Sequence, residues 1–311
     1  MTTQVAAAPA VVARPSAATQ IRGQRGMPKR RQFVLQLICL AIAATVLFPI
    51  LWIVAMSLDP RDISRPDSLI PPGASLAAYA KVMARPTLND ISFLRLALNS
   101  VAIAVVISLA SVSIGAMAAY AFSRLQFRGR EILMIGILAV LMLPAVATIA
   151  PLFVQLNKIQ VGGVNLRASL IGVALAVTSS QLPFAIWNIK GYLDTIPREL
   201  EEAASIDGAG RFQIFLKVIL PLATPVLAVT AFFGFIAGWT EFYFSSVFLT
   251  GNVDLTTLAM ALNGMVGQYA ASTPWSQFAA FSVLVALPVS VVYLFLQRYI
   301  ISGLTVGGVK G

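Results

Sequence analysis

The chain has 311 residues, of which 58% are hydrophobic and only 11% are charged, and its formal net charge is +10. A soluble domain of this size cannot bury so much apolar surface, so we expect a membrane protein. The basic residues lie in short loops beside apolar stretches rather than on one polar face, which argues against nucleic-acid binding. With no histidine and a single cysteine, neither a metal site nor histidine-based acid–base catalysis is expected.

The N-terminal stretch predicts a tail followed by one membrane helix. Residues 1–31 are rich in Ala, Val, Pro, Thr and Gln, a composition typical of a disordered tail. The uncharged stretch 32–58 follows three basic residues and so resembles the start of a signal peptide. It is longer than a signal-peptide hydrophobic region, and no small-residue cleavage site closes it. We therefore interpret 32–58 as an uncleaved first membrane helix.

Five further uncharged stretches predict five more membrane helices. Each has the roughly 20 residues that cross about 30 Å of hydrocarbon. They are 96–123, 132–157, 168–189, 218–240 and 255–297, the last with one span near 276–296. Kinks are expected near Pro144 and Pro225. The predicted fold class is all-α, a polytopic membrane protein with six transmembrane helices in residues 32–302, whose core covers about 95–300.

The distribution of basic residues predicts how the helices are oriented. With six spans both termini lie on one side, and the tails and loops of that side carry 15 Lys and Arg residues against 7 on the other. Because positive charge is retained in the cytoplasm, both termini and the 190–217 loop are expected inside the cell. The outer segment 59–93 has a predicted short helix from Ser75 to Met83. This segment is either a contact for a partner outside the membrane or a solvated loop.

The 190–217 loop is the most charged interior part of the chain and predicts a helical hairpin. Asp194 or Thr195 is expected to cap its first helix, and three glutamates in the first turn suit the helix dipole. Gly208 and Gly210 can take the left-handed conformation that stops a helix. Helical spacing then restarts over residues 211–220. The apolar residues expected on one side of this second helix are Phe212, Phe215 and Ile219.

The residues of this loop resemble the EAA signature of the membrane subunits of binding-protein-dependent ABC importers. The match comprises Glu202-Ala203-Ala204, Gly208 and Leu220-Pro221 at the spacing of the signature, with Val218 where the pattern usually has Ile. The two alanines leave a low ridge that a cleft of another protein could accept. The alternative is a solvated amphipathic hairpin without a partner. The resemblance assigns coupling to an ATPase to Glu202, Ala203, Ala204, Asp207, Gly208, Leu220 and Pro221.

Three other segments resemble the carbohydrate permeases of the same family. Residues 119–130 are similar to the inner end of the second core helix, and residues 239–242 resemble the family's Trp-Asn-Glu-Phe with Thr240 in place of Asn. Residues 303–311 resemble the cytoplasmic C-terminal tail of MalG-like subunits, the smaller permeases of maltose-type importers. A frayed terminus is the alternative for this tail. The resemblance implies contact with the ATPases for Gly303, Leu304, Gly307, Gly308 and Lys310.

The resemblance also implies an architecture and a set of partners. It implies the ABC importer type I permease fold, with the EAA loop forming the cytoplasmic coupling helices. The partners would be a second permease subunit in a heterodimer, two ATPase subunits inside, and an extracytoplasmic sugar-binding protein, in the cell membrane of a prokaryote. ATP and Mg would be used by the ATPases. This chain lacks the phosphate loop Gly-x4-Gly-Lys-Ser/Thr, so we expect it to be no enzyme and to bind no cofactor or metal itself.

Glu241 is the only acidic residue embedded among apolar residues near the end of a span. Carboxylates in such places are usually functional or paired. One interpretation is a substrate path formed by Glu241, Tyr243 and Ser245, since aromatic faces and hydroxyls bind sugars. The other is an interfacial residue in an aromatic belt with Trp239 and Phe242.

A secondary transporter or channel that works without ATPases is the alternative function. It would need ionisable groups within the membrane spans to couple to ions or protons. Apart from Glu241, the six predicted spans have none.

Overall fold

The computed structural model describes residues 28–266 and 273–307, with side chains as far as Tyr299. Contacts divide the chain into two units, Met1–Leu51 and Trp52–Gly311. The first unit contains most of helix α1 (Lys29–Leu58), which begins three residues before the predicted span. The predicted disordered tail lies largely outside the described residues.

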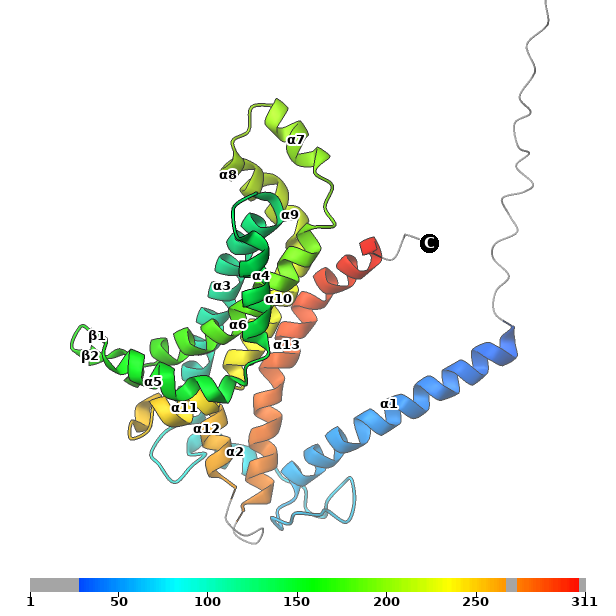
Figure 1. Cartoon of the computed structure of the whole chain (residues 1–311). Helices are drawn as coiled ribbons and strands as arrows, with labels where there is room; N and C mark the ends of the chain where they lie inside the picture. Colours follow the sequence, from blue (N-terminus) through cyan, green and yellow to red (C-terminus); the bar gives the residue numbers. More distant parts are fainter. Residues whose placement is uncertain (1–27, 267–272, 308–311) are drawn as a thin grey trace, which may run out of the picture. The chain divides into compact units, whose positions relative to one another are not determined.

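The second unit is almost entirely helical (Figure 1). Its helices are α2 (Ala77–Ala84), α3 (Phe93–Arg124), α4 (Arg130–Leu141), α5 (Ile149–Asn157), α6 (Leu170–Leu193), α7 (Glu199–Ile206), α8 (Arg211–Ile214), α9 (Leu220–Leu222), α10 (Thr224–Trp239), α11 (Tyr243–Phe248), α12 (Leu258–Gly264) and α13 (Trp275–Gly307). Short 3-10 turns cover Ala145–Thr148, Leu166–Ala168 and Val253–Leu255, and a π-helical turn covers Phe215–Ile219. Strands β1 (Gln160–Val161) and β2 (Val164–Asn165) form a small antiparallel hairpin.

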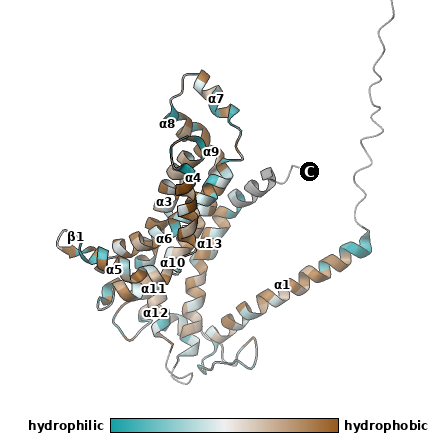
Figure 2. Ribbon diagram, viewed as in Figure 1, coloured by the Kyte–Doolittle hydropathy of each residue, from teal (hydrophilic) through white to brown (hydrophobic). Residues whose placement is uncertain are grey.

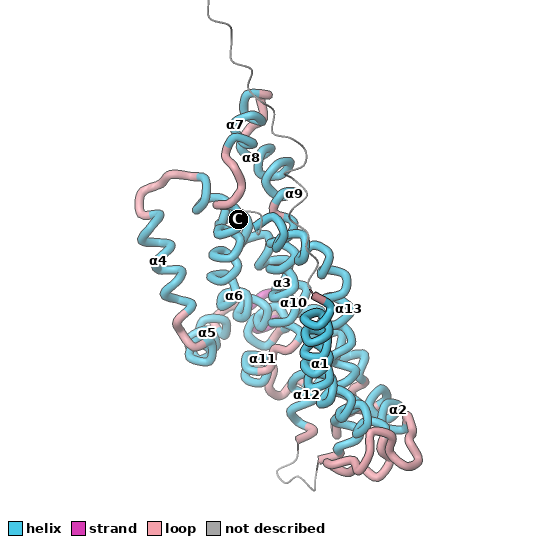
Figure 3. The backbone as a smooth tube through the Cα atoms, turned by 90° about the vertical axis from the view of Figure 1, so that its right-hand side faces the viewer, coloured by secondary structure: helices cyan, strands magenta, loops and turns pink. Residues whose placement is uncertain are grey.

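Within the described residues, five helical segments are long and apolar enough to cross a membrane, and a sixth span results if one broken pair counts as one. The broken pair is α4 with the stretch Ala145–Asn157, and its two arms meet at 102° (Figures 1 and 3). Pro144 lies at the break, where the missing N–H and the ring prevent the helix from continuing. The kink expected at Pro144 is therefore found, but it is a full break of the predicted 132–157 span.

The fifth predicted span is displaced along the chain. It was expected over 218–240, whereas the membrane-length helical segment runs over Thr224–Phe248. Residues 218–223 instead belong to the π-helical turn, α9 and the junction before α10. Pro225 occupies the first turn of α10, where proline is tolerated, so it marks a helix start rather than a kink.

The two ends of the second unit differ in character. Helices α7 and α8 lie at one end, and α2 and α12 lie at the opposite end (Figures 1 and 3). Hydrophilic residues gather in and around α7, whereas the long helices are largely hydrophobic (Figure 2). The loop between α6 and α10 and the segment 59–93 are therefore at opposite ends of the helix bundle.

Small residues bring α3 close to both of its main neighbours. A Cβ built on Gly238 of α10 would lie 2.5 Å from the Cα of Ala104 in α3. A Cβ built on Gly115 of α3 would lie 3.1 Å from the Cβ of Ala185 in α6. Because packing rather than a hydrophobic driving force holds helices together in lipid, these contacts make α3, α6 and α10 the packed core.

The C-terminal helix is longer than predicted. Helix α13 continues to Gly307, so Gly303, Leu304 and Gly307, which were assigned to a tail, lie in its last turns. The segment 298–306 is mostly apolar, and a single glycine inside a helix costs only about 1 kcal/mol. Gly308 and Lys310 lie outside the described residues, and contact of this tail with an ATPase stays a prediction.

Candidate functional site

Helix α7 carries the EAA residues and ends as the sequence predicts. Gly208 has a φ of +85°, the left-handed conformation that favours glycine. The N–H of Gly208 donates to the carbonyl of Ser205 at 3.1 Å, and the N–H of Ala209 donates to the carbonyl of Ala204 at 3.0 Å. This pair of bonds is the Schellman motif, which satisfies the last carbonyl groups of a helix. The turn after α7 is thus fixed by Gly208.

The second helix of the hairpin is interrupted. Gly210 has a φ of −71° and is not left-handed; it precedes α8, and its N–H donates to Oε1 of Gln213 at 3.1 Å. The expected helix over 211–220 is α8 followed by the π-helical turn and α9. The apolar side predicted for this helix is only partly buried. Phe215 and Ile219 are buried, but Phe212 is 70% exposed.

The exposed face of α7 differs from the ridge that was predicted. Glu202, Ala203, Asp207 and Gly208 are exposed, whereas Ala204 is half-buried and packs on the apolar cluster beneath α7. Ile206, three residues after Ala203 and 87% exposed, lies on the same side of the helix. The exposed face of α7 therefore consists of Ala203 with Ile206 and flanking carboxylates. The exposure of Ile206 and Phe212 was not predicted, because it depends on how α7 and α8 pack against the rest of the bundle.

The last two residues of the EAA pattern lie in α9, just before α10. Leu220 is half-buried and packs against the same apolar cluster, and Pro221 is exposed in α9. Proline within the first positions of a short helix costs no hydrogen bond. These two residues thus position the hairpin rather than contribute to the exposed face of α7.

Asp194 does not cap α7, and neither does Thr195. Helix α7 follows Arg198, which makes no side-chain cap, and Asp194 instead ends α6. Its Oδ2 accepts from Lys190 Nζ at 2.6 Å, and its Oδ1 accepts from Ser123 Oγ at 2.6 Å. Although burial opposes ionisation, these two hydrogen bonds hold the pKa of Asp194 below its ordinary value. Asp194 therefore joins α6 to the C-terminal end of α3.

Glu241 is a buried helix cap. Its carboxylate accepts from the backbone N–H groups of Phe244 and Ser245, both at 2.8 Å, and from the Ser245 hydroxyl. These donors are the first free N–H groups of α11, which a carboxylate stabilises. Tyr243 is 60% exposed, whereas Glu241 and Ser245 are buried, and a substrate path through these three residues stays a prediction. Of the aromatic residues in the alternative belt, Trp239 is fully buried, with Nε1 donating to the Val285 carbonyl at 3.0 Å.

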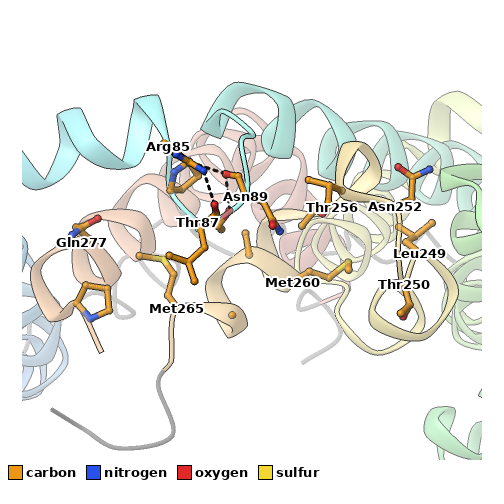
Figure 4. Close-up of a pocket in the computed structure, with 17 residues that line it drawn as sticks. Arg85, Thr87, Asn89, Leu249, Thr250, Asn252, Thr256, Met260, Met265 and Gln277 are labelled. Atoms are coloured by element: carbon orange, nitrogen blue, oxygen red, sulfur yellow. Dashed lines mark hydrogen bonds between the residues drawn. The ribbon is translucent and has the colours of Figure 1, made fainter. Parts of the chain in front are cut away.

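A hollow of about 910 Å³ opens at the end of the bundle opposite α7. It is lined by the loop 85–89, the loop 249–253, α12 and the start of α13 (Figure 4). Arg85 folds the first loop by donating from Nη2 to the Leu88 carbonyl at 2.6 Å and from Nε to the Asn89 carbonyl at 3.3 Å. The polar side chains that line the hollow are those of Arg85, Thr87, Asn89, Thr250, Asn252, Thr256 and Gln277. The residues of the predicted substrate path lie outside this lining.

Comparison with known proteins identifies the family. Residues 111–306 match the model of the binding-protein-dependent transport system inner membrane component. The chain belongs to this family. The matched part of this transport-system component contains α7 and every residue from Glu202 to Pro221. The EAA loop thus lies within the matched residues, and its coupling to an ATPase stays a prediction.

Two relatives are similar over nearly their whole length. The trehalose/maltose transport system permease protein MalG of Thermococcus litoralis is 36% identical over 290 residues, 90% of this chain and 99% of the relative. The maltose/maltodextrin transport system permease protein MalG of Escherichia coli strain K12 is 35% identical over 295 residues, 91% of this chain and 97% of the relative. The predicted resemblance to MalG-like permeases is therefore confirmed.

Solved structures confirm the fold of this inner membrane component. A chain of a bacterial ABC transporter involved in the import of alginate superposes with a TM-score of 0.70 at 24% identity, covering 89% of this chain and 99% of that one. A chain of the MetNI methionine ABC transporter superposes with a TM-score of 0.51 at 20% identity, covering 68% and 95%. The all-α ABC importer permease fold predicted from the sequence is the fold observed.

Proposed function

We propose that this permease carries a sugar or oligosaccharide across the cell membrane of a prokaryote, as one subunit of an ATP-binding-cassette importer. The names of its trehalose/maltose and maltodextrin relatives support the substrate class. A second permease subunit, two ATPase subunits and an extracytoplasmic binding protein complete the proposed complex. The ATPases use ATP and Mg, whereas this chain has no phosphate-binding loop and hydrolyses nothing itself.

The observation that carries this proposal is the exposed face of α7. Ala203 and Ile206 offer a small and a large apolar side chain on one side of a helix that stands at the end of the bundle. The distribution of basic residues supports a cytoplasmic location for this end and for both termini. A cleft on an ATPase would cover Ile206 and hold the flanking Glu202 and Asp207.

The outer hollow supports the other half of the proposal. It lies at the end opposite α7, and its amide, hydroxyl and guanidinium groups suit the hydroxyls of a sugar. We place the entry of the delivered sugar here rather than at Glu241. In this arrangement the sugar arrives at one end of the bundle, and the force that releases it arrives at the other.

Residues 303–311 have a proposed role in contacting the ATPases, as the resemblance of this tail suggests. Deletion of 308–311 is expected to lower ATP-driven uptake while insertion into the membrane is retained. Unchanged uptake by this variant would remove the tail from the proposed function.

A reconstitution experiment tests the proposal. We expect labelled maltose or trehalose to enter proteoliposomes only when the partner permease, the ATPases and the binding protein are present with ATP. Ala203→Trp should abolish ATPase co-purification and uptake, because the bulky ring blocks close docking of α7. Arg128→Trp, which places the same ring at an exposed residue of the neighbouring 124–130 loop, is the control and should behave as wild type. Uptake by this chain alone would instead indicate a secondary transporter.

A further inference from the structure

An enclosed ion pair joins the coupling helix to the membrane core. Arg124 is the last residue of α3, and its Nε donates to Oε1 of Glu201 in the first turn of α7. The two side chains are only 7% and 15% exposed. The remaining nitrogens of Arg124 are also used: Nη2 donates to the Ile196 carbonyl at 2.9 Å and Nη1 to Ser123 Oγ at 3.1 Å. Every nitrogen of the guanidinium therefore has a partner.

The positions of the two residues suit their charges. Arg124 is a cation at the C-terminal end of α3, and Glu201 is an anion at the N-terminal end of α7, which is the arrangement that both helix dipoles favour. The second carboxylate oxygen of Glu201 accepts from the hydroxyl of Tyr120 at 3.4 Å. A planar guanidinium with fixed partners holds its geometry better than an ammonium group would. The Arg124–Glu201 ion pair thus fixes the relative orientation of the two side chains in addition to their electrostatic attraction.

The contact could transmit a movement to the other spans only if α3 is held firmly against them. Helix α3 is packed against both α6 and α10. The inner part of α3 packs against α6 at Gly115 and Ala185, and Ser123 bonds Asp194 at the end of α6. Nearer the N-terminal end of α3, the backbones of α3 and α10 are in close contact at Ala104 and Gly238. Packed helices of this kind move as units rather than bending smoothly. A displacement of the end of α3 is therefore shared by α6 and α10.

We propose that Arg124 is a positioning residue that latches α7 to α3, so that a displacement of α7 becomes a movement of the α3–α6–α10 core. This inference rests on the proposed coupling of α7 to an ATPase. Docking and transmission are assigned to different sides of the helix. Ala203 and Ile206 face outward and bind the ATPase, whereas Glu201 faces the bundle and passes the movement on.

The test measures uptake and ATP hydrolysis in the same proteoliposomes, with the full set of partner subunits, the binding protein and labelled maltose. In Arg124→Gln and in Glu201→Gln, ATPase co-purification and ATP hydrolysis should persist. The amount of sugar taken up per ATP hydrolysed should fall about tenfold, within the range of effects seen for networked pairs. Arg128→Gln and Glu199→Gln remove one charge each at exposed neighbouring positions and should leave this ratio unchanged.

A charge exchange separates transmission from simple loss of structure. Arg124→Glu alone places like charges together and should lower the ratio at least as much as Arg124→Gln. Combining it with Glu201→Arg should restore part of the ratio, but not all, because the exchanged charges oppose both helix dipoles. If the double variant takes up no more sugar per ATP hydrolysed than Arg124→Glu alone, the latch is wrong.

Other outcomes distinguish the latch from the proposed function. If the wild-type chain binds an ATPase and imports sugar, and both Gln variants keep the wild-type ratio, only the latch is wrong. If the Gln variants lose the ATPase in proportion to uptake, the pair serves docking and the latch is again wrong. If the wild-type chain itself binds no ATPase, the proposed function fails and the latch fails with it.

Discussion

Gly238 of α10 lies so close to Ala104 of α3 that no side chain fits between the two backbones. A Cβ on Gly238 would come within 2.5 Å of the Ala104 Cα and 2.8 Å of its N. Gly234, four residues earlier, is similarly close to Ser108, whose Oγ donates to the Ala231 carbonyl at 2.9 Å. The spacing of the two glycines is that of the GxxxG helix-packing motif. The α3–α10 contact is therefore a backbone-to-backbone contact at the centre of the bundle.

Gly238→Ala is expected to destabilise the protein despite the better helix propensity of alanine. Overpacking of this kind typically costs about 1–3 kcal/mol, against a propensity gain of about 1 kcal/mol. The midpoint of thermal unfolding in detergent should fall. Gly136→Ala in α4 is the matched control, because nothing lies within 4 Å of a Cβ at that position, and its midpoint should stay level or rise. A wild-type midpoint for Gly238→Ala would mean that α3 and α10 separate easily.

Gly208 offers a test of backbone conformation without packing effects. Its φ is +85°, and nothing in this chain lies within 4 Å of a Cβ at this position, so within the chain any effect of substitution comes from the left-handed backbone. The left-handed conformation costs an ordinary residue roughly 1–2 kcal/mol, and a β-branched residue tolerates it least.

The expected order for uptake is therefore wild type, then Gly208→Asn, then Gly208→Val. Asparagine tolerates the left-handed region, whereas valine should unwind the end of α7 and separate ATP hydrolysis from uptake. Membrane levels of the three proteins should match, which immunoblotting of the membrane fraction checks. Equal uptake by the Val and Asn variants would show that the turn after α7 has no part in coupling.

The course of the helices could be predicted from the sequence wherever the cause was local. Long uncharged stretches gave the membrane helices, Pro144 gave the break, and Gly208 gave the end of α7. The 102° angle at the break could not be predicted, because it depends on what α4 and α5 pack against. The apolar residues 218–223 looked like part of a span. In the structure they belong to the π turn, to α9 with Pro221 and to the junction before α10, whose first turn holds Pro225.

The site was predictable only in part for a similar reason. The EAA residues form a local pattern, so their helix and its terminating turn followed from the sequence. Arg124 and Glu201 are 77 residues apart, and nothing near either one indicates the other. Glu241 was recognised as unusual, but whether a carboxylate near a span faces a cavity or caps a helix depends on the turn that follows it. That turn begins α11, which the sequence did not predict.

Glu241→Ala should act on folding rather than on sugar affinity. Removing the carboxylate leaves the buried N–H groups of Phe244 and Ser245 without an acceptor, at about 1–3 kcal/mol for each unsatisfied group. We expect a lower unfolding midpoint and less folded permease, with an unchanged sugar concentration for half-maximal uptake.

Glu241→Gln keeps one acceptor oxygen and should lie between the alanine variant and wild type. Tyr243→Ala, at an exposed neighbouring position, should leave the unfolding midpoint close to wild type. A selective rise in the half-maximal sugar concentration for Glu241→Gln, at normal stability, would return Glu241 to the substrate path.

Asp59, just after α1, should make the outer segment sensitive to acid. It is buried, and hydrogen bonds from the Arg61 side chain, at 2.8 and 3.0 Å, hold its pKa below the ordinary 3.8 despite the opposing effect of burial. The Asp59 carbonyl also accepts from Ser276 Oγ at 2.5 Å, which connects this turn to the start of α13. A carboxylate whose pKa is lowered by folding stabilises the folded state above its unfolded pKa, and this stabilisation is lost as the pH falls through the folded value.

Thermal unfolding of the detergent-solubilised protein between about pH 3 and pH 7 measures this effect. The midpoint temperature of the wild type should decrease at pH values below about 4. In that range Asp59 is protonated in the unfolded chain but still ionised in the folded protein. Asp59→Asn should lower the midpoint at neutral pH and flatten its decline toward acid, because the ion pair with Arg61 is already absent. Asp67→Asn removes the exposed second partner of Arg61 and should change the profile little. An acid decline in Asp59→Asn as steep as that of wild type would assign the sensitivity to other carboxylates.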